Sequence, residues 1–108
     1  MVREMSVQQL AEKLAAQAPV YLLDVRQAWE HELTSLPGSQ LIPLDQLTAR
    51  AAEVQPAAGV PVIVYCHHGI RSRSGAALLE RLGQTEVFSL AGGIDAWSLR
   101  IDAKVPRY

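Results

Sequence analysis

The chain has 108 residues, which gives room for one domain with one hydrophobic core. About half of the residues, 49%, are apolar, a proportion that is typical of a globular domain and excludes a disordered chain. Ten basic and eleven acidic residues give a net charge of −1, so we expect neither nucleic acid nor an anionic membrane as a partner. No apolar run approaches the roughly 20 residues that a membrane-spanning helix needs.

The single cysteine, Cys66, limits the chemistry that the chain can perform. The first residues, 1–4, lack the apolar stretch of a secretory signal, so the expected location is the cytoplasm, where a thiol stays reduced. One cysteine excludes an internal disulfide and a zinc site of the multi-cysteine kind. Two interpretations of Cys66 remain at this point: a small buried apolar residue, or a reactive thiol.

Helix and strand patterns alternate along the first half of the chain. Ser6 and Gln9 have the spacing of a capping box, and the apolar periodicity that follows predicts a helix over residues 7–17. The apolar run 20–23 predicts a strand that is buried on both faces and ends at Asp24. The other predicted elements of this half are a turn at 37–38, a very short strand at 41–42, and a helix that is capped by Asp45 and stops before Pro56.

The second half contains the clearest strand, at residues 60–65, which are apolar and mostly β-branched. A loop over 66–72 leads into a helix predicted over 73–82, with Gly83 as its stop. The remaining predicted elements are a strand at 87–90, a turn at Gly92-Gly93, a short helix that includes Ile94, Ala96 and Trp97, and an irregular tail from residue 100. Short apolar strands that alternate with helices indicate an α/β domain, with a central parallel sheet and helices on both faces.

The loop from Cys66 to Ser72 carries the most informative chemistry. In open parallel sheets, ligands bind beyond the carboxyl ends of the strands, and Cys66 lies at such an end. The backbone N–H groups after it can point inward and form an anion site, and Gly69 allows the bend that this needs. The same positive field favours a thiolate. These features predict a nucleophilic cysteine that attacks electrophilic sulfur and holds the resulting persulfide.

Three further side chains of the loop have possible roles. Arg71 lies near the positive end of the helix dipole, so it needs an anionic partner, either a substrate or a carboxylate. His67 and His68 suggest a metal site, but neighbours in sequence rarely face one ion, and no other ligand accompanies them at suitable spacing. We therefore expect no metal centre, and expect the two histidines to tune the thiolate or to line the mouth of the site.

The other singled-out residues have structural interpretations. Asp24 and Arg26 follow a strand, where a charge pair, or a carboxylate that accepts loop N–H groups, would hold the neighbouring active loop in shape. Trp29 and Trp97 are expected to be core or lid aromatics, and neither indicates a cofactor.

Four segments resemble the signatures of the rhodanese (thiosulfate sulfurtransferase-like) family, in order and over nearly the whole chain. The segment from Cys66 to Ser72 is similar to the active loop of that family, with four residues between the cysteine and Arg71. The other three similar segments are Asp24-Val25-Arg26 followed by Glu30, Leu36-Pro37-Gly38-Ser39 followed by Ile42-Pro43, and Gly92-Gly93-Ile94-Asp95-Ala96-Trp97. The resemblance implies a small rhodanese-like α/β domain over residues 1–108.

The resemblance also implies an activity, which is sulfur transfer through a persulfide on Cys66 without a cofactor or metal. Substrate binding would fall to the loop residues His67, His68, Gly69, Ile70, Arg71 and Ser72. The implied donor is thiosulfate or a small persulfide, and the implied acceptor is cyanide, a thiol or a carrier protein. His67 stands where relatives often have arginine, and a neutral imidazole is a weaker partner for an anion, so the natural donor is left open.

Two other functions were weighed against sulfur transfer. Cysteine phosphatases and arsenate reductases of related fold place five residues between cysteine and arginine, whereas this loop has four, His67 to Ile70, which argues against them. A sulfur-relay module that docks a partner within a larger pathway would share the chemistry of Cys66 and stays open.

Overall fold

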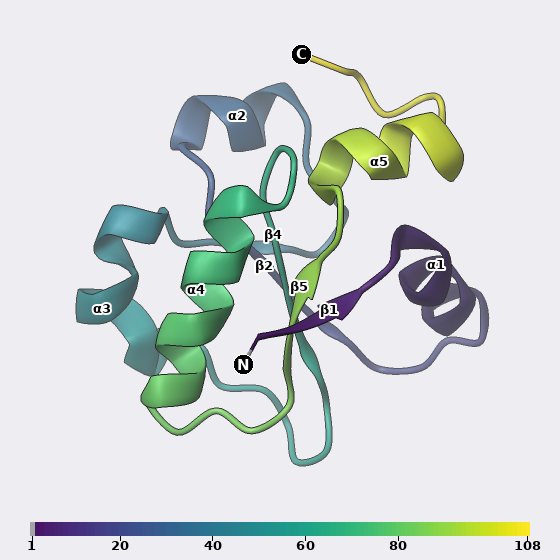
Figure 1. The fold of residues 1–108 in the computed structure, drawn as a ribbon. Coiled ribbons are helices and arrows are strands. Elements are labelled where there is room, and N and C mark those ends of the chain that lie inside the picture. The colour runs from purple at the N-terminus through teal and green to yellow at the C-terminus, as the bar shows by residue number, and fades with distance from the viewer. Residues whose placement is uncertain (1) are drawn as a thin grey trace.

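The computed structural model, which describes residues 2–108, contains a five-stranded sheet in which every neighbouring pair of strands is parallel (Figure 1). The strands are β1 (Arg3–Met5), β2 (Tyr21–Asp24), β3 (Gln40–Leu41), β4 (Val62–Tyr65) and β5 (Val87–Leu90), in the order β1-β5-β4-β2-β3. Since β4 and β2 lie inside the sheet and are flanked on both sides, their apolar runs are explained by burial. The predicted α/β fold with a parallel sheet is confirmed.

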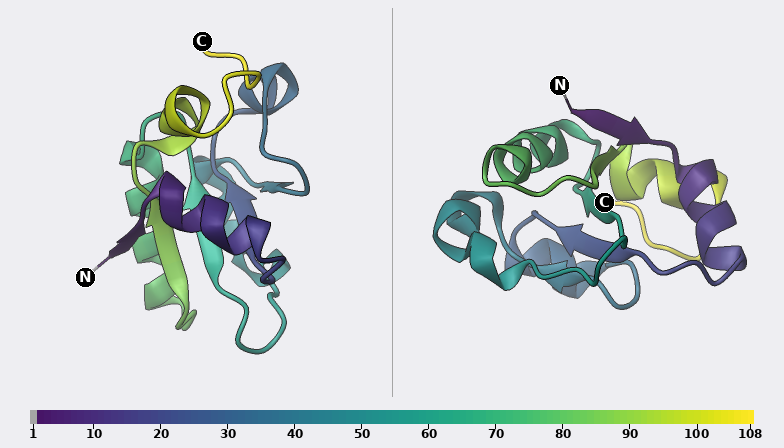
Figure 2. Two further views of the ribbon diagram at one scale, coloured as in Figure 1. Left: turned by 90° about the vertical axis from the view of Figure 1, so that its right-hand side faces the viewer. Right: turned by 90° about the horizontal axis from the view of Figure 1, so that it is seen from below.

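The helices cover both faces of this sheet (Figures 1 and 2). They are α1 (Val7–Ala15), α2 (Ala28–Leu33), α3 (Leu47–Arg50), α4 (Ile70–Arg81) and α5 (Gly93–Arg100), and 3-10 turns at Leu44–Gln46 and Ala51–Glu53 flank α3. Successive side chains of β4 point to opposite faces. Val62 and Val64 therefore pack in the core beneath α3 and α4, and Ile63 and Tyr65 in the core beneath α1 and α5. Within residues 2–108, no helix is long and apolar enough to cross a membrane.

Several predicted boundaries were confirmed and others were wrong. The capping box is present, because the Gln9 N–H donates to Ser6 Oγ at 3.0 Å and the Ser6 N–H donates to Gln9 Oε1 at 2.9 Å. The helix predicted to begin at residue 45 is a short α3 between two 3-10 turns. Strand β1 and helix α2 were not predicted, because β1 has three residues and the exposed apolar residues of α2 hide its periodicity.

The most consequential difference concerns the start of α4. This helix begins at Ile70, three residues before the predicted start at Arg73. Gly69 is its N-cap and has a φ of 100°, a left-handed conformation that glycine adopts without steric cost. The earlier start places Arg71 and Ser72 in the first helical turn, where backbone N–H groups have no partner within the helix.

Candidate active site

The Cys66 sulfur lies directly after β4 and is surrounded by hydrogen-bond donors. The N–H groups of Gly69 and Ser72 donate to it from 3.1 and 3.3 Å, and the Cys66 thiol in turn donates to the Ser72 hydroxyl oxygen at 3.5 Å. The Ser72 hydroxyl is also 2.7 Å from the hydroxyl of Ser89 on β5, and both serines are fully buried. The cysteine itself is only 1% exposed. Such donors stabilise negative charge on a buried sulfur.

The backbone of the active loop is held from behind by the start of α5. The Ile94 N–H donates to the Cys66 carbonyl at 2.9 Å, and the Asp95 N–H donates to the His67 carbonyl at 3.1 Å. This close approach depends on Gly93, since a Cβ atom there would lie 2.4 Å from the Cys66 oxygen and 2.5 Å from the His67 oxygen. The Gly-Gly segment is therefore part of the site, whereas the sequence indicated only a turn.

Arg71 is paired with a carboxylate from α2. Its two terminal nitrogens donate to the two oxygens of Glu30 at 2.7 and 2.9 Å, and its side chain keeps 34% exposure. Glu30 is nearly buried and also accepts a hydrogen bond of 2.6 Å from the Tyr108 hydroxyl. The hydrogen bonds from Arg71 are the main cause that lowers the pKa of Glu30 to about 2, and the same pairing raises the pKa of Arg71. Of the two anionic partners expected for Arg71, the carboxylate is present.

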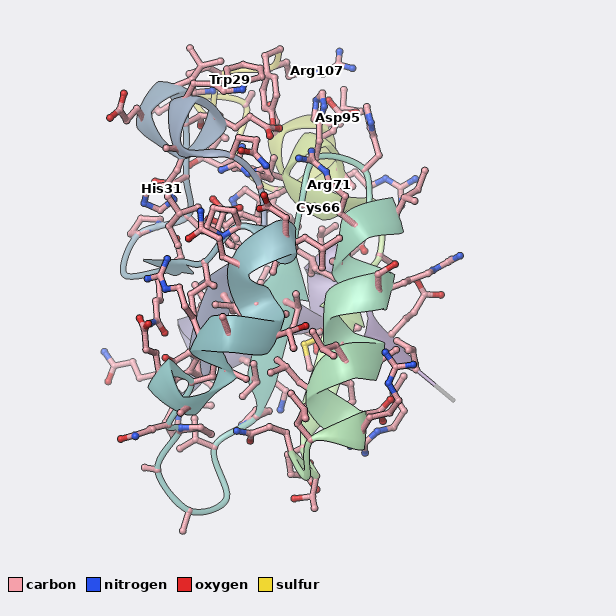
Figure 3. The ribbon with its side chains drawn as sticks, turned by 90° about the vertical axis from the view of Figure 1, so that its left-hand side faces the viewer. Trp29, His31, Cys66, Arg71, Asp95 and Arg107 are labelled. Atoms are coloured by element: carbon pink, nitrogen blue, oxygen red, sulfur yellow. The ribbon has the colours of Figure 1, made fainter. Side chains whose placement is uncertain are left out.

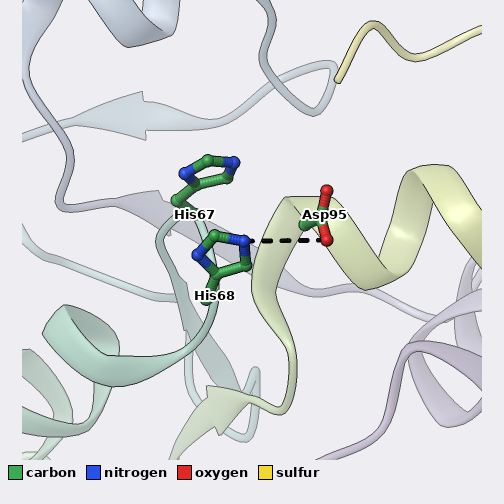
Figure 4. Close-up of side chains that lie close together, drawn as sticks. All are labelled: His67, His68 and Asp95. Carbon is green, nitrogen blue, oxygen red and sulfur yellow. Dashed lines mark ion pairs between the residues drawn. The ribbon is translucent and has the colours of Figure 1, made fainter. Parts of the chain in front are cut away.

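His67 and His68 follow Cys66 and stack on one another, with ring centroids 3.9 Å apart (Figure 4). Burial, and then the neighbouring His68, lower the pKa of His67, so its imidazole is neutral near pH 7. Asp95 of α5 approaches His68 at 3.7 Å, which brings a third possible metal ligand that sequence spacing did not reveal. One possible ligand atom from each of His67, His68 and Asp95 lies within 4.8 Å of the other two, and Asp95 is already paired with Arg107 at 2.8 Å.

Asp24 and Arg26 form a fully buried ion pair beside this site. Arg26 donates to both oxygens of Asp24, at 2.8 and 2.7 Å, and to the carbonyl of Thr34 at 2.6 Å. It also donates to the Tyr108 hydroxyl at 2.8 Å, and His31 lies 2.9 Å from Asp24. The pair therefore connects the end of β2 with the end of α2. Its contacts reach the Cys66 loop through Tyr108, which bonds to Glu30, and through the ring of Tyr65, which directly precedes Cys66 and lies 5.4 Å from the Arg26 guanidinium.

The two tryptophans differ in position. Trp97 is buried in the core beside α1, whereas Trp29 is 61% exposed, so of the two expected positions, core or lid, the core is excluded for Trp29. Trp29 contacts the ring of Tyr108 edge-on, with centroids 5.9 Å apart. Ile70, in the loop itself, is 77% exposed. Figure 3 shows that Cys66, Arg71, Trp29 and Asp95 all lie toward one end of the molecule.

Three residues of this region had no predicted role. Glu30 was noted only as part of a family signature, and its spacing from Arg26 was the available signal. Ser89 lies in an apolar strand, where a buried hydroxyl needs a partner, so its polarity was a weak signal. Tyr108 belongs to a tail without periodicity, and no sequence pattern predicts its contacts.

The fold and the loop define a class of protein: a parallel α/β domain with a donor-surrounded cysteine at the carboxyl end of its central strand. The family model of the rhodanese-like domain matches residues 6–100, and the chain belongs to this family. A protein of Bacillus subtilis named YqhL is 39% identical over 77% of this chain, which covers 64% of that protein. This chain covers only 38% of the length of another curated relative.

Two further comparisons place the chain among proteins with sulfur-related names. A protein of Allochromatium vinosum named sulfurtransferase is 32% identical over 91% of this chain and 90% of its own length. The crystal structure of a thiosulfate sulfurtransferase from Pseudomonas aeruginosa superposes with a TM-score of 0.83 at 28% identity. That match covers 98% of this chain and 20% of the Pseudomonas chain.

Proposed function

We propose that this chain is a sulfurtransferase that carries sulfur as a persulfide on Cys66. The observation that carries the proposal is the pair of backbone N–H groups, those of Gly69 and Ser72, that donate to the buried Cys66 sulfur. Donors fixed in a buried site stabilise charge that develops during a reaction without reorganising. Membership of the rhodanese-like family and the similarity to a protein named sulfurtransferase support the same function.

In the first half-reaction, the Cys66 thiolate attacks the outer sulfur of thiosulfate or of a small persulfide. The S–S bond of the donor breaks, its electron pair leaves with sulfite or a thiolate, and the outer sulfur stays bonded to Sγ. Arg71 and the N–H groups of Gly69 and Ser72 stabilise the charge on Sγ and on the transferred sulfur, and the Ser72 hydroxyl, which accepts from the thiol, turns to donate once the thiol is ionised. The remaining loop side chains, His67, His68 and Ile70, would line the path of the substrate.

In the second half-reaction, an acceptor attacks the outer sulfur of the Cys66 persulfide. The S–S bond breaks, the electron pair returns to Sγ, and the acceptor leaves with the sulfur as thiocyanate or a new persulfide. The acceptor is cyanide in an assay and a thiol or a carrier protein in the cell. Because the enzyme alternates between two covalent forms, ping-pong kinetics are expected. His67 is neutral and Arg71 is shared with Glu30, which favours a donor of lower charge than thiosulfate.

The test is the mass and the activity of the Cys66→Ser variant. Intact-mass measurement of the wild-type chain after incubation with thiosulfate should show one added sulfur atom that cyanide removes. Cys66→Ser should show no such addition and no thiocyanate formation while its melting temperature stays close to that of the wild type. Retained activity in this variant would refute the proposal, and hydrolysis of a phosphate ester by the wild type would favour the phosphatase alternative.

A further inference from the structure

The segment after α5, residues 102–108, runs across the end of the molecule that holds the candidate active site. Figures 1 and 2 show it leaving α5 and turning toward α2. It has few attachments: Ser98 Oγ donates to the Val105 carbonyl at 2.6 Å, and Arg107 pairs with Asp95 at 2.8 Å. The Asp102 N–H donates to the Trp97 carbonyl at 3.0 Å, Val105 packs against the core beneath α1 and α5, and Tyr108 makes further contacts. Most side chains of this segment are exposed, so it is held less firmly than the helices beneath it.

Tyr108 contacts the active loop on two sides. Its ring lies flat on the ring of His67, with centroids 3.8 Å apart and an interplanar angle of 7°. Its hydroxyl donates to Glu30, which holds Arg71. Tyr108 therefore joins the residue directly after Cys66 to the ion pair of the loop arginine, and so spans the loop that surrounds the sulfur.

Next to this contact, the Cys66 residue and the Nε2 atom of His67 are closed to solvent, although the rest of His67 is partly exposed. Cys66 is only 1% exposed. Among the described residues, the Nε2 atom of His67 is the one buried side-chain nitrogen or oxygen that lacks a hydrogen-bond partner. A cysteine that receives and passes on sulfur has to meet two substrates in turn, so part of its cover has to move. The loop backbone is fixed against Gly93, which leaves the weakly attached segment 102–108 as the part that opens at least cost.

We propose that Tyr108 is a specificity-determining residue that limits the size of the molecule that reaches Cys66. While its ring covers His67, a small thiophile such as cyanide reaches the sulfur. A bulky thiol reaches it only after the ring has left His67 and its hydroxyl has left Glu30. That these molecules accept sulfur rests on the proposed function, whereas the restriction of access to Cys66 does not.

Alkylation of Cys66 measures access without any sulfur transfer. Two reagents with the same electrophile and different size, iodoacetamide and its fluorescein conjugate, are compared on the intact chain. Tyr108→Ala is expected to raise the rate at which the conjugate alkylates Cys66 about tenfold. The rate at which iodoacetamide alkylates Cys66 should rise less than about twofold. Tyr108→Phe keeps the stacked ring but loses the hydroxyl bonds to Glu30 and Arg26, so its ratio of conjugate to iodoacetamide rates should lie between those of the wild type and Tyr108→Ala. Lys104→Ala, an exposed position of the same segment, is the matched control.

The proposal is overturned if Tyr108→Ala speeds both reagents equally, or neither. If thermal melting shows that this variant is unstable, Arg107→Gln, which removes the exposed pair with Asp95, is expected to change the ratio in the same direction. The ratio of kcat/KM for a bulky thiol to that for cyanide should rise in parallel. If the alkylation ratio shifts in Tyr108→Ala but the wild-type chain transfers no sulfur, the proposed function is contradicted. The role of Tyr108 in limiting access to Cys66 is then still supported.

Discussion

Arg71 and Glu30 form a two-bond ion pair that ties the active loop to α2 across 41 positions of sequence. A cation in the first turn of a helix is placed unfavourably against the helix dipole. Glu30 offsets this, because both of its oxygens accept from the guanidinium and its side chain is only 4% exposed. The loop arginine therefore has its counter-charge within the folded chain, and the position of the loop depends on a residue of another helix.

Glu30→Gln is expected to lower the free energy of unfolding by about 1–3 kcal/mol near neutral pH, since charged hydrogen bonds are lost. The folded chain lowers the pKa of Glu30 from 4.5 to about 2. The stabilisation is therefore present above pH 4.5 and is lost as the pH falls toward about 2. Urea denaturation of the wild type and of Glu30→Gln across this pH range measures the stabilisation, and Glu53→Gln, at an exposed ion pair, is the control. A difference between wild type and Glu30→Gln that is unchanged across the range would contradict this prediction.

Gly93→Ala is expected to displace the active loop. The new Cβ would meet the Cys66 and His67 carbonyl oxygens at 2.4 and 2.5 Å, and the φ of 61° disfavours any side chain. We expect a loss of stability of more than about 2 kcal/mol and a changed alkylation rate of Cys66. Gly59→Ala is the matched control, because Gly59 has a φ of 77° but no atom within 4 Å of the added Cβ. Equal effects of the two substitutions would mean that backbone strain alone is responsible.

Ser72→Ala is expected to slow the formation of the Cys66 persulfide about tenfold or more, because it removes the hydroxyl that accepts from the thiol and that can turn to donate to the thiolate. The hydroxyl lies 3.5 Å from Sγ, while the Ser72 N–H at 3.3 Å is kept. Single-turnover mass measurement with thiosulfate gives the rate of this half-reaction. Ser74→Ala, an exposed position of the same helix, should leave the rate unchanged. An unchanged rate in Ser72→Ala would remove the hydroxyl from the proposed mechanism.

Asp24→Asn is expected to destabilise the chain by about 3–5 kcal/mol, since it leaves the buried Arg26 without its anionic partner. Arg73→Gln, which breaks the exposed ion pair with Glu4, should lower the free energy of unfolding by less than about 1 kcal/mol. Thermal and urea denaturation measure both. A small effect of Asp24→Asn would show that the other contacts of Arg26, including the Tyr108 hydroxyl, suffice for its charge.

The sequence predicted the elements whose residues carry a strong local pattern. Continuous apolar runs gave β2, β4 and β5, and Ser6 with Gln9 gave the start of α1. Strand β1 escaped prediction because it exists only through its pairing with β5, where Arg3 lies opposite Phe88. Such pairing is a long-range property, and three residues with two charges have no pattern of their own.

For the candidate site, the sequence predicted the residue types but not their partners. The Cys66 loop and Gly69 were found because a strand, a glycine and a helix follow one another locally. The pairing of Arg71 with Glu30 and the cover by Tyr108 depend on how distant helices and segments pack. For the same reason the sequence could not decide between the core and lid positions of Trp29, since an aromatic residue in a short helix gives no sign of which side faces the core.

The contact of α5 with the active loop also sets the direction of the loop's peptide groups. In a planar trans peptide, the carbonyl and the following N–H point in opposite directions. Because Ile94 and Asp95 take the carbonyls of Cys66 and His67, the N–H groups of His67 and His68 are turned away from α5. Helix α5 thus orients dipoles around the cysteine without touching its sulfur. A partner that shifted α5 would therefore change the reactivity of Cys66 without any substitution in the loop.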